Sequence, residues 1–264
     1  MSIKAKKSLG QNFLINENIV NLISKSVEIK SNDVLLEIGA GTGNLTEKLI
    51  NHSPKIIYIV EKDEILSNHL HKKFGDQLNI INQDILDFDE RTISKTDKLM
   101  IFGNLPYNIS TQILVKQVIN NYNYQNIKCM VLMFQKEVAD RIIAKINTKN
   151  YSRISIISQL FFKITKIKDI GPENFKPKPK VNSTILCFYP KNIVYNFNNI
   201  NNLQNITKIF FNQRRKKIKN PLNQLFKKTD EIAQKLNLNI ELRPQNLSPD
   251  IYYKIAKEYE NLVN

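Results

Sequence analysis

The segment from Val34 to Gly43, which reads VLLEIGAGTG, places the strongest constraint on the fold of this chain. Four of its first five residues are apolar, the pattern of a strand that is buried on both faces. The glycines that follow predict a tight turn into a helix over residues 45–50. In open α/β sheets, nucleotides bind at such a turn, at the carboxyl end of a strand. The segment therefore predicts an α/β domain that binds a nucleoside.

The rest of the first 190 residues alternates strand-like and helix-like segments. Strand-like runs cover 55–60, 78–82, 99–103 and 127–134, helical patterns cover 111–120 and 136–146, and strands near 164–170 and 181–189 end the series. The apolar run over 155–162 is ambiguous, and we interpret it as a helix. Such alternation is typical of a largely parallel, doubly wound sheet.

The spacing of the glycines narrows the class of nucleoside. A dinucleotide fingerprint requires a glycine at position 44, where this chain has Asn44. The order of Glu37, Gly39, Gly41 and Gly43 fits S-adenosylmethionine better, because this cofactor has no pyrophosphate for a helix N-terminus to hold. The sequence therefore predicts a methyl donor in this turn.

Two further acids follow the next strands in chain order. Glu61 ends the strand over 55–60, roughly 20 residues past the glycines, where a carboxylate can take both ribose hydroxyls. Asp84 follows the strand over 78–82 and can accept from the exocyclic amine of the adenine. Acids after successive strands, in register with a glycine-rich turn, strengthen the prediction of an adenosine-containing cofactor.

The tetrapeptide that starts at Asn104 can grip a planar ring that bears an amino group. The side-chain oxygen of Asn104 and the carbonyl of Leu105 can both accept from such an amine. Pro106 restricts Leu105 to an extended conformation, and Tyr107 offers a ring for base stacking, worth roughly 1–3 kcal/mol. By itself, the segment fits a proline turn at a strand end equally well.

Phe175 begins the connection Phe-Lys-Pro-Lys-Pro-Lys, which its two alternate prolines stiffen in an extended form. We expect Phe175 to stack on the base face opposite Tyr107, and to complete a catalytic set with Asn104, Leu105 and Pro106. The alternative is a rigid loop in which the ring of Phe175 is buried.

The sequence changes character near residue 191, where an Asn-rich linker over about 191–200 leads to helical stretches without strands. We therefore expect a Rossmann-like domain over 1–190 and a small α-helical domain over 191–264. Five cations stand close together in the second domain: Arg214, Arg215, Lys216, Lys217 and Lys219. Such a run is usually a solvated face, but on a chain with a net charge of +15 we expect it to contact nucleic-acid phosphates.

Composition excludes several other classes of protein. The net charge of +15 predicts a polyanionic partner, either nucleic acid or an anionic membrane surface. No apolar run approaches the ~20 residues of a membrane span, and the N-terminus lacks an apolar signal core, so we expect a cytoplasmic protein that does not use a membrane.

The three histidines show no metal-ligand spacing. Cys129 and Cys187 lie in strand-like runs, where buried free thiols are expected.

Together these motifs resemble those of the ribosomal RNA small-subunit adenine dimethyltransferase family. The resemblance runs nearly end to end and also includes the segments over 7–14, 211–216 and 243–248. It implies that Gln11, Asn12 and Leu14 line the cofactor site, which the local sequence does not show. Departures at Asn182, Lys217 and Gln245 leave the expected chemistry untouched.

The resemblance implies a monomeric enzyme that dimethylates N6 of two adjacent adenosines near the 3′ end of 16S ribosomal RNA, within an immature small subunit. Large-subunit adenine methyltransferases of the antibiotic-resistance type share the catalytic motifs. A non-catalytic ribosome assembly factor could also retain the fold. The Phe-Asn-Gln-Arg-Arg run starting at Phe211 favours the small-subunit enzyme, and the intact glycines, acids and Asn104 argue against a dead site.

Overall fold

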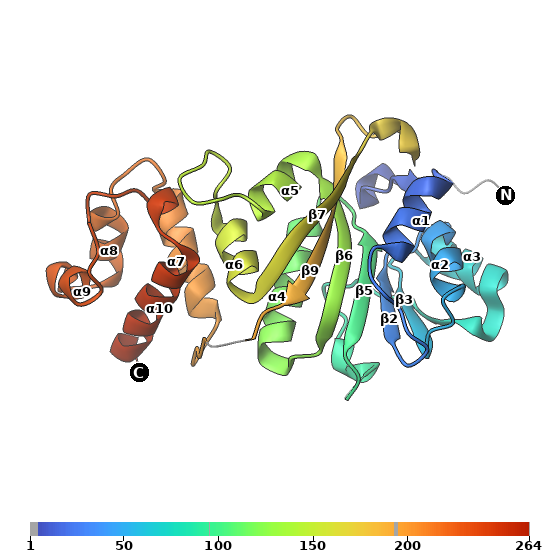
Figure 1. Cartoon of the computed structure of the whole chain (residues 1–264), viewed down its shortest axis with the longest axis horizontal. Coiled ribbons are helices and arrows are strands. Elements are labelled where there is room, and N and C mark those ends of the chain that lie inside the picture. Colours follow the sequence, from blue (N-terminus) through green and yellow to red (C-terminus); the bar gives the residue numbers. More distant parts are fainter. Residues whose placement is uncertain (1–4, 95, 193–194, 264) are drawn as a thin grey trace. The chain divides into compact units, whose positions relative to one another are not determined.

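The computed structural model describes residues 5–94, 96–192 and 195–263. The chain divides into two compact units. The first consists of residues 1–139 and 163–190, and the second of residues 140–162 and 191–264. Figure 1 shows the strands gathered in the first unit and the last four helices in the second.

A seven-stranded sheet organises the first unit, in the order β4-β3-β2-β5-β6-β9-β7 (Figure 1). Its strands are β2 (Val34–Ile38), β3 (Ile56–Val60), β4 (Asn79–Ile81), β5 (Leu99–Asn104), β6 (Ile127–Gln135), β7 (Phe162–Ile170) and β9 (Ser183–Pro190). The strand pairs from β4 through to β6 are parallel, and β9 pairs antiparallel with β6. This topology confirms the expected Rossmann-like sheet.

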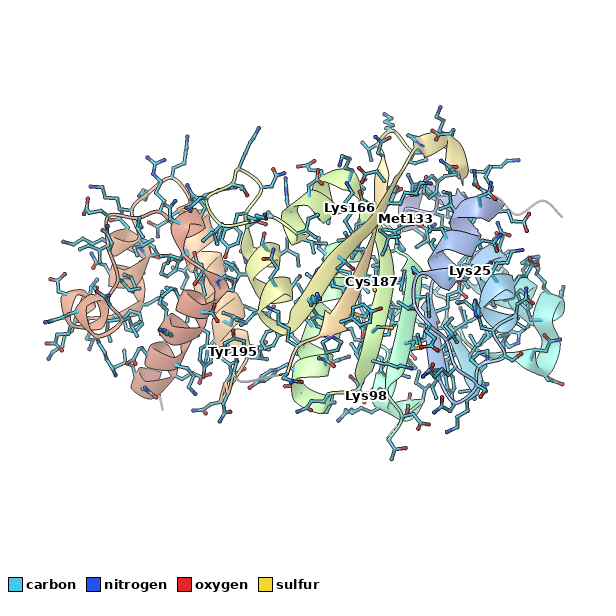
Figure 2. The ribbon with its side chains drawn as sticks, viewed as in Figure 1. Lys25, Lys98, Met133, Lys166, Cys187 and Tyr195 are labelled. Atoms are coloured by element: carbon cyan, nitrogen blue, oxygen red, sulfur yellow. The ribbon has the colours of Figure 1, made fainter. Side chains whose placement is uncertain are left out.

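Helices precede, connect or follow the parallel strands in chain order. They are α1 (Glu17–Lys25), α2 (Asn44–Ile50), α3 (Glu64–Phe74), α4 (Ser110–Tyr124) and α5 (Lys136–Ile142). One buried cluster joins Ile23 of α1, Leu49 of α2 and Leu70 of α3 to side chains of the sheet. Met133 of β6 and Cys187 of β9, both labelled in Figure 2, belong to this cluster. Burial of these apolar side chains is the main source of the unit's stability.

A second sheet of two short strands ties the N-terminal segment to the proline-containing connection. β1 (Phe13–Leu14) pairs antiparallel with β8 (Phe175–Lys176), and Leu14 lies opposite Phe175. Short 3-10 turns are η1 (Lys7–Leu9), η2 (Gly75–Gln77), η3 (Glu90–Thr92), η4 (Pro172–Asn174) and η5 (Pro244–Asn246). The pairing places the segment before α1 beside the carboxyl ends of the parallel strands.

The second unit is helical. It contains α6 (Arg153–Phe161), α7 (Asn201–Asn212), α8 (Lys219–Leu225), α9 (Thr229–Lys235) and α10 (Pro249–Val263). Apolar residues recur every three or four positions on α7 and α10, so that Leu203, Ile206 and Phe210 are buried, as are Tyr252 and Ile255. The described helices include none that is long and apolar enough to cross a membrane.

Residues 140–162 group with the C-terminal helices, whereas the sequence placed them in the first domain. Helix α6 packs on α7 and α10, and the Phe161 ring lies 6.2 Å from the ring of Tyr195. Strand–helix alternation does not reveal which neighbour a helix packs against. Helix α5 ends at Ile142 rather than near 146. The domain boundary expected near residue 191 coincides with a boundary between the two units, which lies between residues 190 and 191. Positions 193 and 194 of the expected linker lie outside the described residues.

Candidate active site

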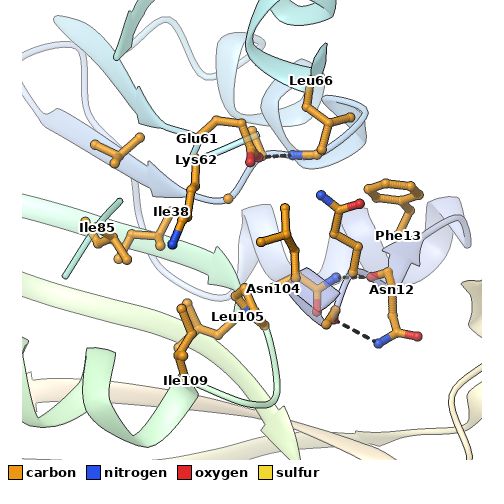
Figure 3. Close-up of a pocket in the computed structure, with 18 of the residues that line it drawn as sticks. Asn12, Phe13, Ile38, Glu61, Lys62, Leu66, Ile85, Asn104, Leu105 and Ile109 are labelled. Carbon is orange, nitrogen blue, oxygen red and sulfur yellow. Dashed lines mark hydrogen bonds between the residues drawn. The ribbon is translucent and has the colours of Figure 1, made fainter. Parts of the chain in front are cut away.

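A pocket lies at the carboxyl ends of β2, β3 and β5, with the N-terminal segment along one side (Figure 3). Parallel strands end at one edge of the sheet, and this edge is where α/β folds bind ligands. All nine residues expected to bind the cofactor line this pocket: Gln11, Asn12, Leu14, Glu37, Gly39, Gly41, Glu61, Asp84 and Asn104. Leu105, Pro106 and Tyr107 line the same pocket. The fold therefore brings together segments more than 90 residues apart in the sequence.

The glycine-rich turn leaves room for a ligand. Gly39 has a φ of +68°, and no heavy atom lies within 4 Å of the place where a Cβ would stand. At Gly41, with a φ of +59°, a Cβ would lie 2.9 Å from the ring of Phe13. Larger residues would strain the backbone at either position, fill the pocket at Gly39 and push away the N-terminal strand at Gly41.

Two buried carboxylates border the turn. Glu37 is 2% exposed, and burial raises its pKa to about 7 although the hydroxyl of Thr46 donates to it at 2.7 Å. Glu61 is 6% exposed, and its two oxygens accept from the backbone N–H groups of Gly41 at 3.1 Å and Asp63 at 2.9 Å. Burial raises the pKa of Glu61, and these two hydrogen bonds oppose the shift. Each oxygen retains a lone pair for a ligand hydroxyl.

Asp84 stands at the next strand end, held by two hydrogen bonds. Its Oδ1 accepts from the N–H of Leu86 at 2.9 Å, and its Oδ2 from the ammonium of Lys62 at 2.7 Å. Partial burial raises the pKa of Asp84, but the contacts with Lys62 and the N–H of Leu86 together outweigh this effect, and the pKa lies below its usual value. Lys62 also lines the pocket (Figure 3), although the sequence did not predict a role for it. The only sign of Lys62 in the sequence is its position directly after Glu61, and solvated lysines are common at such positions.

The amide of Asn104 has a defined orientation. Its Nδ2 donates to the backbone carbonyl of Asn12 at 2.8 Å (Figure 3). A carbonyl oxygen can only accept, so the nitrogen of the amide must face Asn12. The Oδ1 atom is thereby left to act as an acceptor at the pocket.

Tyr107 is fixed by a contact that the sequence did not reveal. Its hydroxyl lies 2.5 Å from the Oγ of Ser183, the first residue of β9, and Ser183 is fully buried. Burial raises the pKa of Tyr107, and the bond to Ser183 opposes this shift. The phenol therefore remains neutral and anchored at neutral pH.

Comparison with known proteins identifies the chain. The family described as Ribosomal RNA adenine dimethylase matches residues 2–261. The chain belongs to this family. It is therefore an enzyme, an adenine dimethyltransferase of ribosomal RNA whose methyl donor is S-adenosylmethionine.

Several relatives carry the name "Ribosomal RNA small subunit methyltransferase A". The protein from Pelagibacter ubique is 50% identical to this chain, and the match covers 99% of both. The protein from Ehrlichia canis is 41% identical over 96% of this chain and 97% of its own length. Among solved structures, a dimethyladenosine transferase from Plasmodium falciparum has a TM-score of 0.79 and 30% identity, covering 94% of this chain and 98% of its own. The 23S rRNA methyltransferase ErmE, at a TM-score of 0.68 and 19% identity over 94% of this chain and 100% of its own, shows only a shared fold.

The pocket of this dimethyltransferase fits its cofactor chemically. The carboxyl groups of Glu37, Glu61 and Asp84 line the pocket. S-adenosylmethionine carries a positive sulfonium, an ammonium group, two ribose hydroxyls and an adenine amine, and carboxylates can pair with or accept from each of these groups. Apolar side chains, among them those of Ile38, Leu66 and Ile85, also line the pocket. Within the described ranges, no group of three or more His, Cys, Asp or Glu side chains is placed to hold a metal ion.

The structure buries Phe175 instead of opening it to a base. Its side chain is 3% exposed, belongs to the core cluster and is absent from the pocket lining. The reason is the pairing of β8 with β1, which turns the ring into the core opposite Leu14. The sequence left two interpretations of this loop open, and the structure shows the one in which the ring of Phe175 is buried.

The expected RNA-binding cations lie in the second unit, after α7 and at the start of α8. Arg215, Lys216, Lys217 and Lys219 are exposed. Arg214 is half-buried, and its guanidinium donates to the carbonyl of Lys149 at 2.5 Å, while Lys217 forms an ion pair with Glu241. Buried Ile218 anchors the turn between them.

Proposed function

We propose that this enzyme dimethylates N6 of two adjacent adenosines near the 3′ end of 16S ribosomal RNA. The observation that carries the proposal is the pocket, where Asn104 presents a fixed acceptor beside three carboxylates suited to S-adenosylmethionine. The full-length relatives at 50% and 41% identity, both named as small-subunit enzymes, support this choice of RNA.

Residues of the pocket would hold the cofactor by its polar groups. Glu61 would accept from the ribose hydroxyls and Asp84 from the adenine amine, with the space beside Gly39 open to the amino-acid end. Gln11, Asn12 and Leu14 would close the pocket from the N-terminal side. When bound, S-adenosylmethionine supplies an electrophilic methyl group on its sulfonium sulfur.

Asn104 and Leu105 would activate the target amine. The N6 lone pair of adenine is delocalised into the ring, which makes this nitrogen a poor nucleophile. Acceptance of the two N–H bonds by Asn104 Oδ1 and the Leu105 carbonyl favours a more tetrahedral nitrogen and localises the lone pair. Tyr107 offers a ring face for the extruded base. These residues chiefly position the amine, because the cofactor is already activated.

Proton removal requires no dedicated side chain. The nitrogen becomes acidic as it is alkylated, so water can take the proton. A monomethylated amine retains one N–H, so only one of the two acceptors can be filled in the second round. Because the pocket must accept that substituted amine, Asn104 and Leu105 cannot contribute equally to both transfers.

We further propose that the substrate is the RNA of an immature small subunit, and that the enzyme acts as a cytoplasmic monomer. The exposed cations Arg215, Lys216 and Lys219, together with the net charge of +15, support contact with RNA phosphates.

The test is to incubate the enzyme with methyl-labelled cofactor and, separately, immature small and large ribosomal subunits. Digestion and mass spectrometry should find labelled N6,N6-dimethyladenosine at two adjacent positions of the small-subunit RNA. Label confined to large-subunit RNA would instead indicate an enzyme of the antibiotic-resistance type. Cofactor binding without transfer to any RNA would favour an assembly factor.

A further inference from the structure

The orientation of Asn104 depends on a backbone atom. Its Nδ2 donates at 2.8 Å to the carbonyl of Asn12, within the N-terminal segment of residues 6–14 (Figure 3). A backbone carbonyl lies wherever its segment is held. The position of the catalytic amide is therefore set by whatever fixes this segment beside the pocket.

At its start, the segment is fixed by a closed set of hydrogen bonds around Asp63, which we call the Asp63 latch. The ammonium of Lys6 donates to Asp63 Oδ1 at 2.8 Å, and Gln11 Nε2 donates to Oδ2 at 3.0 Å. Gln11 Oε1 in turn accepts the backbone N–H of Lys6 at 2.7 Å. The Asp63 side chain is 2% exposed, which limits competition from water. Both polar atoms of the Gln11 amide thus serve the latch.

At its other end, the segment is held by two further contacts. Asn44 at the start of α2 donates its Nδ2 to the carbonyl of Leu14 at 2.7 Å. Leu14 also pairs with Phe175 in the two-stranded sheet. Asn12 lies between these fixed ends, two residues from Leu14 and one from Gln11.

The latch also touches the proposed ribose site. The backbone N–H of Asp63 donates to Glu61 Oε1 at 2.9 Å. Asp63 therefore sits between Glu61 and the segment that orients Asn104. It lies too far along the chain from Asn104 for any sequence pattern to connect the two.

We propose that Asp63 is a positioning residue for methyl transfer, which acts through Lys6 and Gln11 to hold the Asn12 carbonyl against the amide nitrogen of Asn104. The latch thereby keeps Asn104 Oδ1 available to the target amine. The inference rests on the proposed role of Asn104 as the acceptor. A purely structural latch would stabilise the fold without affecting Asn104.

The main variant is Lys6→Met, which removes the ammonium but leaves Asp63 to cap α3 through the N–H of Ile65. Loss of one charge-assisted hydrogen bond should lower kcat about tenfold at saturating cofactor and RNA. The Kd for the cofactor should change less than threefold. Because the buried carboxylate of Asp63 loses its cation, Tm should fall by several degrees, so kcat is compared well below the Tm of the variant. Asp63→Asn should act in the same direction, because Asn retains the cap but not the charge. The matched control is Lys55→Met, which breaks a surface ion pair with Asp97 and should leave kcat unchanged.

A second measurement does not depend on activity. The side-chain amide signals of Asn104 can be assigned in NMR spectra by their loss in Asn104→Ala. In Lys6→Met these signals should shift and exchange faster with solvent, while the backbone signal of Ile65 stays in place. If the wild type methylates no RNA, the proposed function fails, and these signals still test the latch. Unchanged Asn104 signals, or unchanged kcat, in Lys6→Met would overturn the positioning role.

Discussion

At the scale of single residues, the amide of Asn104 carries most of the proposed chemistry. In the proposed mechanism its oxygen accepts from the target amine, whereas the contacts proposed for the cofactor are shared among many residues that line the pocket. Asn104→Ala should therefore lower kcat roughly 100-fold, the usual effect of removing one preorganised polar group from a reacting centre. The affinity for S-adenosylmethionine should stay within several-fold of the wild type. Single-turnover kinetics and calorimetric titration measure the two quantities.

The control for this experiment is Asn68→Ala, which removes an exposed amide from α3 outside the pocket. It should leave both quantities unchanged. Equal turnover by Asn104→Ala and the wild type would refute the acceptor role.

Glu37 should make the stability of the protein depend on pH. Burial raises its pKa from 4.5 to about 7, so the folded state retains the proton over a range in which the unfolded state has lost it. Stability therefore falls as pH rises from about 4.5 to about 7, because the folded state must then accept a buried charge. Glu37→Gln removes this cost. The variant should be more stable than the wild type by about 2 kcal/mol at pH 8, with little difference at pH 4.

Urea denaturation at a series of pH values gives both free energies of unfolding. The same difference at pH 4 and pH 8 would show that Glu37 does not titrate over this range.

At the scale of elements, a buried carboxylate ties α4 to the segment after β4. Glu90 is 1% exposed and accepts from Lys116 at 2.9 Å, Gln117 at 2.6 Å and Asn120 at 2.6 Å. The ammonium of Lys116 also donates to the carbonyl of Ile85 at 2.5 Å. Ile85 and the neighbouring Asp84 line the pocket, so this cluster holds the proposed adenine end of the site in place.

Lys116→Met should leave the charge of Glu90 buried without its cationic partner. The free energy of unfolding should fall by about 3 kcal/mol, the usual cost of breaking a buried ion pair from one side. The Kd for S-adenosylmethionine should rise several-fold because the segment around Ile85 loosens. Chemical denaturation and calorimetric titration test these effects, with Lys55→Met as the exposed-pair control. A variant as stable as that control would show that Glu90 does not depend on Lys116.

The elements themselves were largely predictable from the sequence, since buried parallel strands and glycine turns have strong local patterns. Pocket residues such as Glu61 and Asp84 could be predicted because ligands of α/β sheets bind at the carboxyl ends of the strands, where these residues stand. Lys62 and Ser183 were missed because their partners, Asp84 and Tyr107, are brought to them only by folding. The packing of α6 and the burial of Phe175 likewise depend on tertiary neighbours. Local sequence gives the type of an element more reliably than it gives the partner of a side chain.

At the scale of the whole molecule, the net charge of +15 should make RNA binding strongly salt-dependent. Each phosphate that a cation neutralises adds roughly 0.7–0.9 to the slope of log K against log salt. Arg215 and Lys216 are exposed, whereas Arg214 and Lys217 already contact groups of the protein. The double variant Arg215→Ala/Lys216→Ala should therefore reduce the slope by about 1–2 and weaken binding at low salt.

Fluorescence anisotropy with a small-subunit RNA fragment, over a series of KCl concentrations, measures this slope. Lys25→Ala, which removes an exposed cation at the end of α1, is the matched control, and its slope should equal that of the wild type. The affinity for free S-adenosylmethionine should be the same in all three proteins, because Arg215 and Lys216 lie outside the pocket lining. If the double variant keeps the wild-type slope, these cations face solvent in the complex, and the phosphates must be neutralised elsewhere on the chain.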